Sequence, residues 1–196
     1  MILITGATGV VGERPQRSLH RRGVPMKRIA GVTSLVFAGL FAGFLTAVLV
    51  LELSLRRFDG TVYTQVRLAE LDSLDKLAVA TLLPALISTA VLAYRSFRTQ
   101  ARWPSVAAFV LLVFVFGLTL AVNLPINADQ AHWTVQSPPP DWAGLRDRWQ
   151  IAHAVRTAAA VISFVVLALA VPPRAQSSAV PPRARSQAEP SPARSR

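Results

Sequence analysis

Residues 104–122, PSVAAFVLLVFVFGLTLAV, contain no charged side chain and decide the class of fold. A transmembrane α-helix needs about 20 apolar residues to cross the roughly 30 Å hydrocarbon core of a bilayer, and this run is close to that length. Three further apolar runs of similar length lie at residues 29–51, 77–94 and 151–171. The sequence therefore predicts an all-α fold, a four-helix transmembrane bundle, with the lipid bilayer as its partner.

The distribution of charge predicts the orientation of this bundle. Only 16% of the residues are charged although the net charge is +11, whereas a soluble domain usually has about 25% charged residues. Lys and Arg are in excess before the first run, between the second and third, and after the fourth. The positive-inside rule therefore places both termini in the cytoplasm and the segment 123–156 outside, in the inner (plasma) membrane. No nucleic-acid partner is expected, because the basic residues form no compact domain.

The first residues, MILITGATGVVG, resemble the first strand and glycine turn of NAD(P)-binding Rossmann proteins. In such proteins, glycines placed like Gly6, Gly9 and Gly12 let the backbone approach a pyrophosphate. The second strand and every later βα unit are missing, and one βα unit cannot form a sheet, so NAD(P) binding is not expected. Two interpretations of residues 1–28 stay open: a remnant of a neighbouring or fused reductase gene, or a true start at Met26.

The membrane domain is expected to cover residues 29–171. Residues 172–196 are rich in Pro, Arg and Ser and are predicted to be disordered, because they cannot bury a core. Within the first run, Gly39 and Gly43 are small residues four apart, a spacing that lets a neighbouring helix approach closely. Packing inside the bundle is the favoured interpretation, and a homo-oligomer interface is the alternative.

Polar side chains gather in the segment 123–156, which connects the last two runs. Pro125 is predicted to end the third helix, and the amides of Asn123 and Asn127 are expected to bond the freed carbonyls. In the fourth run Trp149, His153 and Arg156 share one helical face at i, i+4 and i+7. A His and an Arg inside a spanning helix are costly unless paired or solvated, so both are functional candidates.

Acidic residues come after the first run and before the second. Glu52 lies among leucines, and the segment that contains Glu70 and Asp75 has leucines at helical spacing and is expected to extend the second helix outward. Because a buried Arg needs a counterion, Arg156 is predicted to pair with one of these three carboxylates.

A family resemblance rests on the motif NLPIN at residues 123–127, on Trp133, and on DWAGLRDRWQIAHAVRT at residues 141–157. These residues resemble the bacterial DUF1772 family, grouped with anthrone oxygenase-like integral membrane proteins. The resemblance covers residues 29–171 and implies a four-helix membrane protein. It also implies oxidation of an anthrone-like aromatic substrate, because fungal relatives are associated with converting anthrones to anthraquinones.

Two mechanisms are compatible with a site at the outer mouth of the bundle. In the first, which needs no cofactor, His153 removes a proton from an aromatic carbon acid and Arg156 stabilises the anion, with Glu52 and Asp75 as further catalytic candidates. Substrate contacts are then assigned to Asn123, Asn127, Trp133 and Trp149, although the tryptophans also suit an interfacial aromatic belt.

In the second mechanism, His153 or His132 joins a carboxylate such as Glu70 in a divalent metal site. The competing class is a non-enzymatic membrane scaffold or partner subunit, in which these polar residues only cap and pair helix ends.

Overall fold

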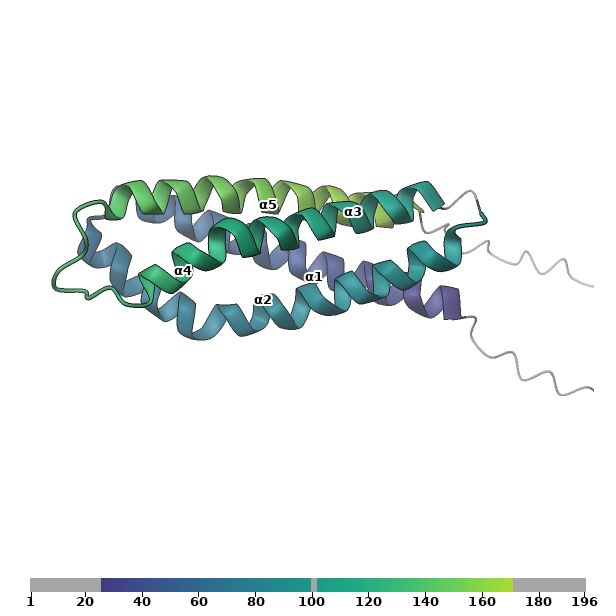
Figure 1. Ribbon diagram of the computed structural model, residues 1–196, viewed down its shortest axis with the longest axis horizontal. Helices are drawn as coiled ribbons and strands as arrows, with labels where there is room; N and C mark the ends of the chain where they lie inside the picture. The colour runs from purple at the N-terminus through teal and green to yellow at the C-terminus, as the bar shows by residue number, and fades with distance from the viewer. Residues whose placement is uncertain (1–25, 100–101, 171–196) are drawn as a thin grey trace, which may run out of the picture.

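The computed structural model describes residues 26–99 and 102–170, which form a bundle of long helices (Figure 1). The predictions for the Rossmann-like start and for the tail fall outside these residues. The elements in chain order are α1 (Met26–Ser54), the 3-10 turn η1 (Leu55–Arg57), α2 (Gly60–Ser96), α3 (Arg102–Leu118), the π-helical turn η2 (Thr119–Asn123), α4 (Leu124–Gln130) and α5 (Trp142–Ala170).

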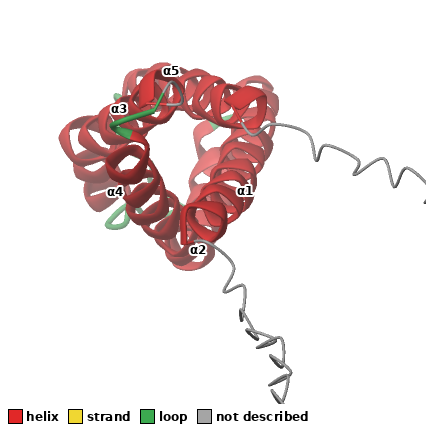
Figure 2. Cartoon of the chain, turned by 90° about the vertical axis from the view of Figure 1, so that its right-hand side faces the viewer, coloured by secondary structure: helices red, strands yellow, loops and turns green. Residues whose placement is uncertain are grey.

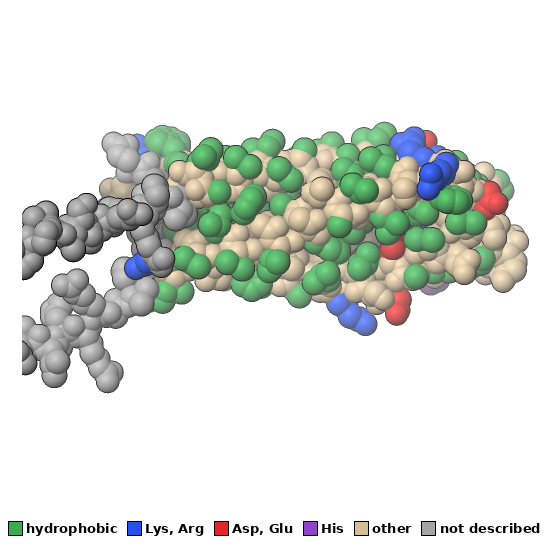
Figure 3. Space-filling view, turned by 180° about the vertical axis from the view of Figure 1, so that it is seen from behind, with side chains coloured by type: hydrophobic (Ala, Val, Ile, Leu, Met, Phe, Trp, Pro, Cys, Tyr) green, Lys and Arg blue, Asp and Glu red, His purple; other side chains and the backbone are tan. Residues whose placement is uncertain are grey.

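The predicted all-α, four-helix membrane fold is confirmed. Among the described residues, four helices are long and apolar enough to cross a membrane, at Arg28–Arg57, Gly60–Ser96, Arg102–Gln130 and Trp142–Ala170. Hydrophobic side chains cover the length of the face seen in Figure 3, while most charged side chains on it lie toward one end. The orientation of the termini relative to a membrane stays a prediction.

The helices surround a common core, in the order α1, α2, α3 with α4, and α5 (Figure 2). Each helix packs on its two neighbours in this ring. The middle of the core is apolar and contains Phe41 and Leu45 from α1, Leu82 from α2, and Leu112 and Val115 from α3. Small side chains such as those of Ala85 and Ala160 let the helices pack closely around these larger groups.

All four helices continue past the apolar runs toward one end, which we call the distal end. It contains η1 and the loop 131–141, and it lies away from Met26 and Ala170 (Figure 1). The predicted extension of α2 beyond its apolar run is confirmed, because α2 begins at Gly60, where Asp59 Oδ1 accepts a hydrogen bond of 3.0 Å from the Val62 N–H. The segment 123–156 is mostly helical, and only residues 131–141 form a connecting loop.

The prediction that Pro125 ends the third helix is wrong. The helix passes through the π-helical turn and continues as α4 to Gln130. The Leu124 N–H bonds to the Thr119 carbonyl, five residues earlier, and Pro125 then occupies the first turn of α4, where a missing N–H costs little. The π-helical turn therefore absorbs the proline and lets the Asn127 side chain face the bundle interior.

Gly39 and Gly43 have different surroundings. A Cβ atom on Gly39 would lie 2.9 Å from Cε2 of Phe164 on α5, so this glycine is needed for helix packing inside the bundle, as predicted. A Cβ atom on Gly43 would meet no described atom within 4 Å.

Candidate functional site

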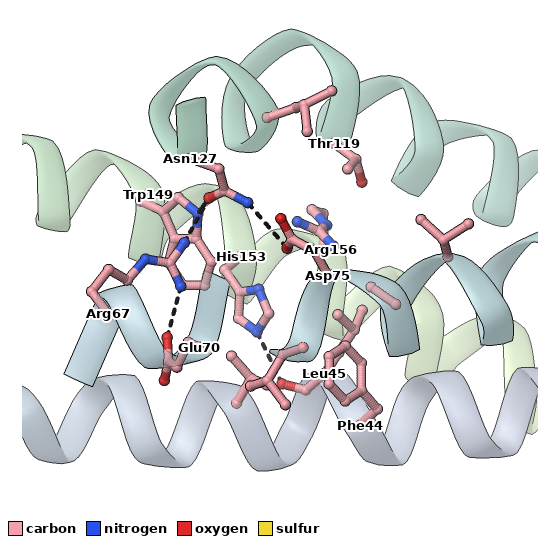
Figure 4. A pocket seen from close by; sticks show the side chains of 15 residues that line it. Phe44, Leu45, Arg67, Glu70, Asp75, Thr119, Asn127, Trp149, His153 and Arg156 are labelled. Carbon is pink, nitrogen blue, oxygen red and sulfur yellow. Dashed lines mark hydrogen bonds and ion pairs between the residues drawn. The ribbon is translucent and has the colours of Figure 1, made fainter. Parts of the chain in front are cut away.

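A cavity of about 130 Å³ lies in the distal half of the bundle, between all four long helices (Figure 4). Its floor is apolar and comes from α1, with Phe44, Leu45 and Val48. The polar side chains that line it come from α2, η2, α4 and α5: Arg67, Glu70, Asp75, Thr119, Asn127, Trp149, His153 and Arg156. Helices that are distant in sequence thus bring a base, cations and carboxylates to one cavity.

His153 has a defined hydrogen-bonding arrangement. Its Nε2 atom lies 3.0 Å from the carbonyl oxygen of Leu45, and because a carbonyl can only accept, Nε2 must donate. The side chain is 2% exposed, and Nδ1 has no hydrogen-bond partner among the described residues. In its neutral form the ring therefore carries a free lone pair on Nδ1.

Trp149 fixes the plane of the His153 ring. The two rings stack with centroids 4.6 Å apart and planes 9° apart. The indole Nε1 donates to Asn127 Oδ1 at 2.7 Å, and the Arg67 guanidinium lies 4.0 Å from the ring centroid. Since Arg67 and His153 both contact this indole, Trp149 is better suited to holding the histidine than to stacking on a substrate.

Arg67 is the centre of the polar network, and it is not among the site residues predicted from the sequence. Its Nη1 lies 2.7 Å from Glu70 Oε2 and 3.4 Å from Glu52 Oε1. Its Nη2 donates to Asn127 Oδ1 at 2.6 Å, and its Nε donates to Gln130 Oε1 at 2.8 Å. The i, i+3 spacing of Arg67 and Glu70 was the available signal.

Arg156 does not form the predicted ion pair. The ion pairs of the described residues involve Arg56, Arg67 and Arg146, and it is Arg67 that binds Glu52 and Glu70. Figure 4 shows Arg156 beside Asp75, whose Oδ1 instead accepts from Asn127 Nδ2 at 3.5 Å. Arg156 is 5% exposed, and its Nε has no partner within the described part of the chain. Arg156 therefore lines the cavity with one N–H that no described residue accepts.

Asn123 and Asn127 do not bond their own helix end, so that expectation is wrong. Asn123 is fully buried and donates from Nδ2 to the backbone oxygen of Trp149 at 3.3 Å. Asn127 connects α4 to Arg67 and Asp75 on α2 and to Trp149 on α5. Both amides therefore join helices, because the π-helical turn carries the chain past Pro125 and orients them inward.

Other predicted site residues lie elsewhere at the distal end. Trp133 packs near Tyr63, with ring centroids 6.4 Å apart, and its Nε1 donates to Asp129 Oδ2 at 3.2 Å. Glu52 is fully buried and lies behind Arg67, outside the cavity lining. His132 is exposed in the loop 131–141. The structure thus brings together His153, Arg156, Asp75, Asn127 and Trp149, and leaves Trp133 and His132 apart from them.

The side chains do not fit the alternative of a metal site. Over residues 26–99 and 102–170, no group of three or more His, Asp and Glu side chains is arranged to hold a metal ion. His132 is exposed in its loop, while Arg67 already binds both Glu52 and Glu70. The Arg67 guanidinium therefore occupies the position beside these two carboxylates that a metal cation would need.

The part of the chain that forms this cavity is similar to one known family. Residues 74–166 match the anthrone oxygenase family model. The match confirms the resemblance seen in the sequence over most of the polar cavity, including Asp75, Asn127, Trp149, His153 and Arg156. Arg67, Glu70 and Glu52 lie before the matched segment. No curated protein and no solved structure matches the chain.

Proposed function

We propose that this protein is a membrane oxygenase of the anthrone oxygenase type, which removes a proton from an acidic carbon of an apolar aromatic substrate and lets dioxygen oxidise it. One observation carries the proposal: His153 and Arg156 line the same cavity, and each has a buried nitrogen, Nδ1 and Nε, without a hydrogen-bond partner among the described residues. Buried polar atoms are nearly always hydrogen-bonded, so these two nitrogens, which with Glu70 Oε1 belong to residues that line one cavity, need an explanation. A substrate that donates to one and accepts from the other supplies it.

The two groups suit the chemistry of a carbon acid such as an anthrone methylene. His153 Nδ1 takes a proton from this carbon, and the negative charge spreads to the substrate oxygen, where the Arg156 guanidinium stabilises it. Dioxygen accepts electrons from the carbanion and forms a C–O bond, and the peroxide takes up the proton. Loss of water then gives the ketone, so that R₂CH₂ + O₂ becomes R₂C=O + H₂O.

The size and opening of the cavity indicate a flat, apolar substrate that projects partly out of the bundle. A cavity of about 150 Å³ lined by apolar side chains holds one benzene molecule, so about 130 Å³ accommodates a single ring. The most exposed apolar lining residues are Val79 on α2, 56% exposed, and Leu124 on α4, 47% exposed. The reacting ring would lie beside His153 while further rings extend between α2 and α4.

The competing function is a scaffold or partner subunit without catalysis. In that case His153 and Arg156 need only satisfy helix ends, and residues with such a role have partners within the protein. A single cavity that is lined by a base, a guanidinium and the carboxylate of Asp75 favours the enzyme instead.

The experiment compares oxidation of anthrone under air by the purified protein and two histidine variants in lipid nanodiscs. His153→Gln should lower the catalysed rate by about 100-fold or more, in line with loss of a general base. His132→Gln removes an exposed histidine from the same end of the bundle and should leave the rate unchanged. A wild-type rate no higher than that of empty nanodiscs would remove the support for an oxygenase and favour the scaffold.

A further inference from the structure

Two buried carboxyl groups share one cation beneath the cavity. Glu52 on α1 is fully buried, Glu70 on α2 is 6% exposed, and both lie against the same atom, Nη1 of Arg67. Because both bind this one nitrogen atom, at 3.4 Å from Glu52 Oε1 and 2.7 Å from Glu70 Oε2, the two carboxyl groups lie close to each other. Figure 4 shows the contact between Glu70 and Arg67 at the edge of the cavity.

The charges of this cluster do not balance if both carboxyl groups are ionised. Two carboxylates and one guanidinium would leave a net charge of −1 away from water, which is strongly unfavourable. Arg67 also donates to Asn127 and Gln130, so its hydrogen-bonding capacity is used. Two of the side chains that other elements bond to this cluster are neutral amides: Gln150 on α5 donates to Glu52 Oε2, and Gln130 on α4 accepts from Arg67 Nε.

The unpartnered oxygen atoms of the two carboxyl groups also indicate that one of them retains a proton. Oε1 of Glu52 and Oε1 of Glu70 are each buried without a hydrogen-bond partner in the described residues. A proton on one of these carboxyl groups, donated to the other, would satisfy both. Two carboxyl groups in contact cannot readily both ionise, since like charges at this distance strongly favour retention of one proton.

We infer that Glu52 and Glu70 share one proton at neutral pH, and that Glu70, which lines the cavity, is the acid of this site. The catalytic part of this inference rests on the proposed function. His153 supplies a base in the same cavity, and the final step of the reaction needs an acid. When the peroxide O–O bond breaks, His153 removes the second hydrogen of the same carbon as a proton, and the electrons of that C–H bond form the C=O bond. The Glu70 O–H bond breaks in the same step, and its proton goes to the departing hydroxide, which leaves as water. The second proton then passes from His153 to restore the carboxyl pair.

The shared proton can be measured without turnover, by infrared spectroscopy of the protein in lipid nanodiscs, in which the spectrum of each variant is subtracted from that of the wild type. At about pH 8 an ordinary Glu, with a pKa of about 4.3, is ionised, so a carbonyl stretch of a protonated carboxylic acid reports an unusual site. The wild type should show this band. Glu52→Gln and Glu70→Gln should each abolish it, because the remaining carboxylate then forms a simple ion pair with Arg67. Asp72→Asn, at an exposed position on the same helix, should leave the band unchanged.

Three results would overturn the inference: a wild type without the band, a band that survives in Glu52→Gln, or a band that survives in Glu70→Gln. If the band behaves as expected, Glu70→Gln should also lower anthrone oxidation about 10-fold or more, whereas unchanged oxidation would refute the acid role. The outcome is separate from that of the proposed function, because the band requires no substrate. If the band is present but the protein shows no oxygenase activity, the inference of a shared proton would stand and the proposed oxygenase function would be rejected.

Discussion

At the scale of single residues, His153 obtains its basic nitrogen from a backbone contact. The Leu45 carbonyl fixes the proton on Nε2, and the stacked Trp149 fixes the ring plane, so Nδ1 presents a lone pair to the cavity. Arg156 is the complementary group, a buried guanidinium with an unused N–H within the described residues. Unsatisfied groups of this kind lower stability, and they persist where function requires them.

The unused N–H of Arg156 predicts opposite effects on activity and stability for Arg156→Gln. The rate of anthrone oxidation should fall by about 100-fold, in line with loss of one donor to a developing oxyanion. The melting temperature should stay equal or rise, because a buried, weakly compensated cation has been removed. Arg148→Gln, an exposed position on the same helix, should change neither quantity. A large loss of stability in Arg156→Gln would instead identify a structural arginine.

Sequence patterns identified part of this site. The i, i+4 and i+7 spacing placed Trp149, His153 and Arg156 on one face because they belong to one helix. The role of Arg67 could not be predicted in the same way, because its partners Glu52, Asn127 and Gln130 come from two other helices, α1 and α4. Their contact depends on how the helices are rotated about their axes, which no local pattern specifies.

At the scale of elements, the π-helical turn Thr119–Asn123 is the feature that shapes the site. It inserts one extra residue into the helical repeat before Pro125 and rotates α4 about the helix axis, so Asn127 faces α2 and α5. Such turns are often found at functional sites. The sequence could not reveal it, because NLPIN is equally typical of a helix that ends at the proline.

A prediction at the scale of elements concerns the close approach of α1 and α5. Gly39→Val should lower the free energy of unfolding by about 1–3 kcal/mol, since its side chain would overlap Phe164 and the core would be overpacked. Gly43→Val is the matched control in the same helix, because nothing described lies near its Cβ position. Thermal unfolding in detergent measures both, and equal melting temperatures would refute the assigned contact.

Another prediction at this scale tests whether the substrate enters the cavity between α2 and α4. Val79→Trp places a large side chain at the opening of the cavity and should raise the KM for anthrone about 10-fold or more. Ile87→Trp adds the same side chain to another exposed position of α2, outside the cavity lining, and should leave KM unchanged. Equal KM values for the two variants would show that the substrate takes another route.

At the scale of the whole molecule, the hydrophobic runs were sufficient to predict the number of helices and their membrane-spanning character. They underestimated the length of the helices at the distal end, because the residues there are polar on the side that faces the bundle interior. A hydropathy pattern marks where lipid begins and ends, whereas α2 and α5 continue beyond that boundary through contacts such as Arg67 with Glu70 and Trp149 with Asn127.

The orientation can be tested directly because the chain contains no cysteine. Gln136→Cys in the distal loop should react with a membrane-impermeant maleimide on spheroplasts. Arg98→Cys, between α2 and α3, should react only after the membrane is permeabilised. This result is expected from the positive-inside rule, and the reverse labelling pattern would place the cavity toward the cytoplasm.

The most direct test of the central claim, proton removal by His153, is exchange of the anthrone methylene protons with D₂O in the absence of oxygen, followed by NMR. The wild type should accelerate this exchange above the rate in empty nanodiscs, and His153→Gln should return it to that rate, because carbon deprotonation precedes any reaction with dioxygen. Exchange at the same rate in the wild type, in His153→Gln and in empty nanodiscs would contradict the claim that His153 is the base.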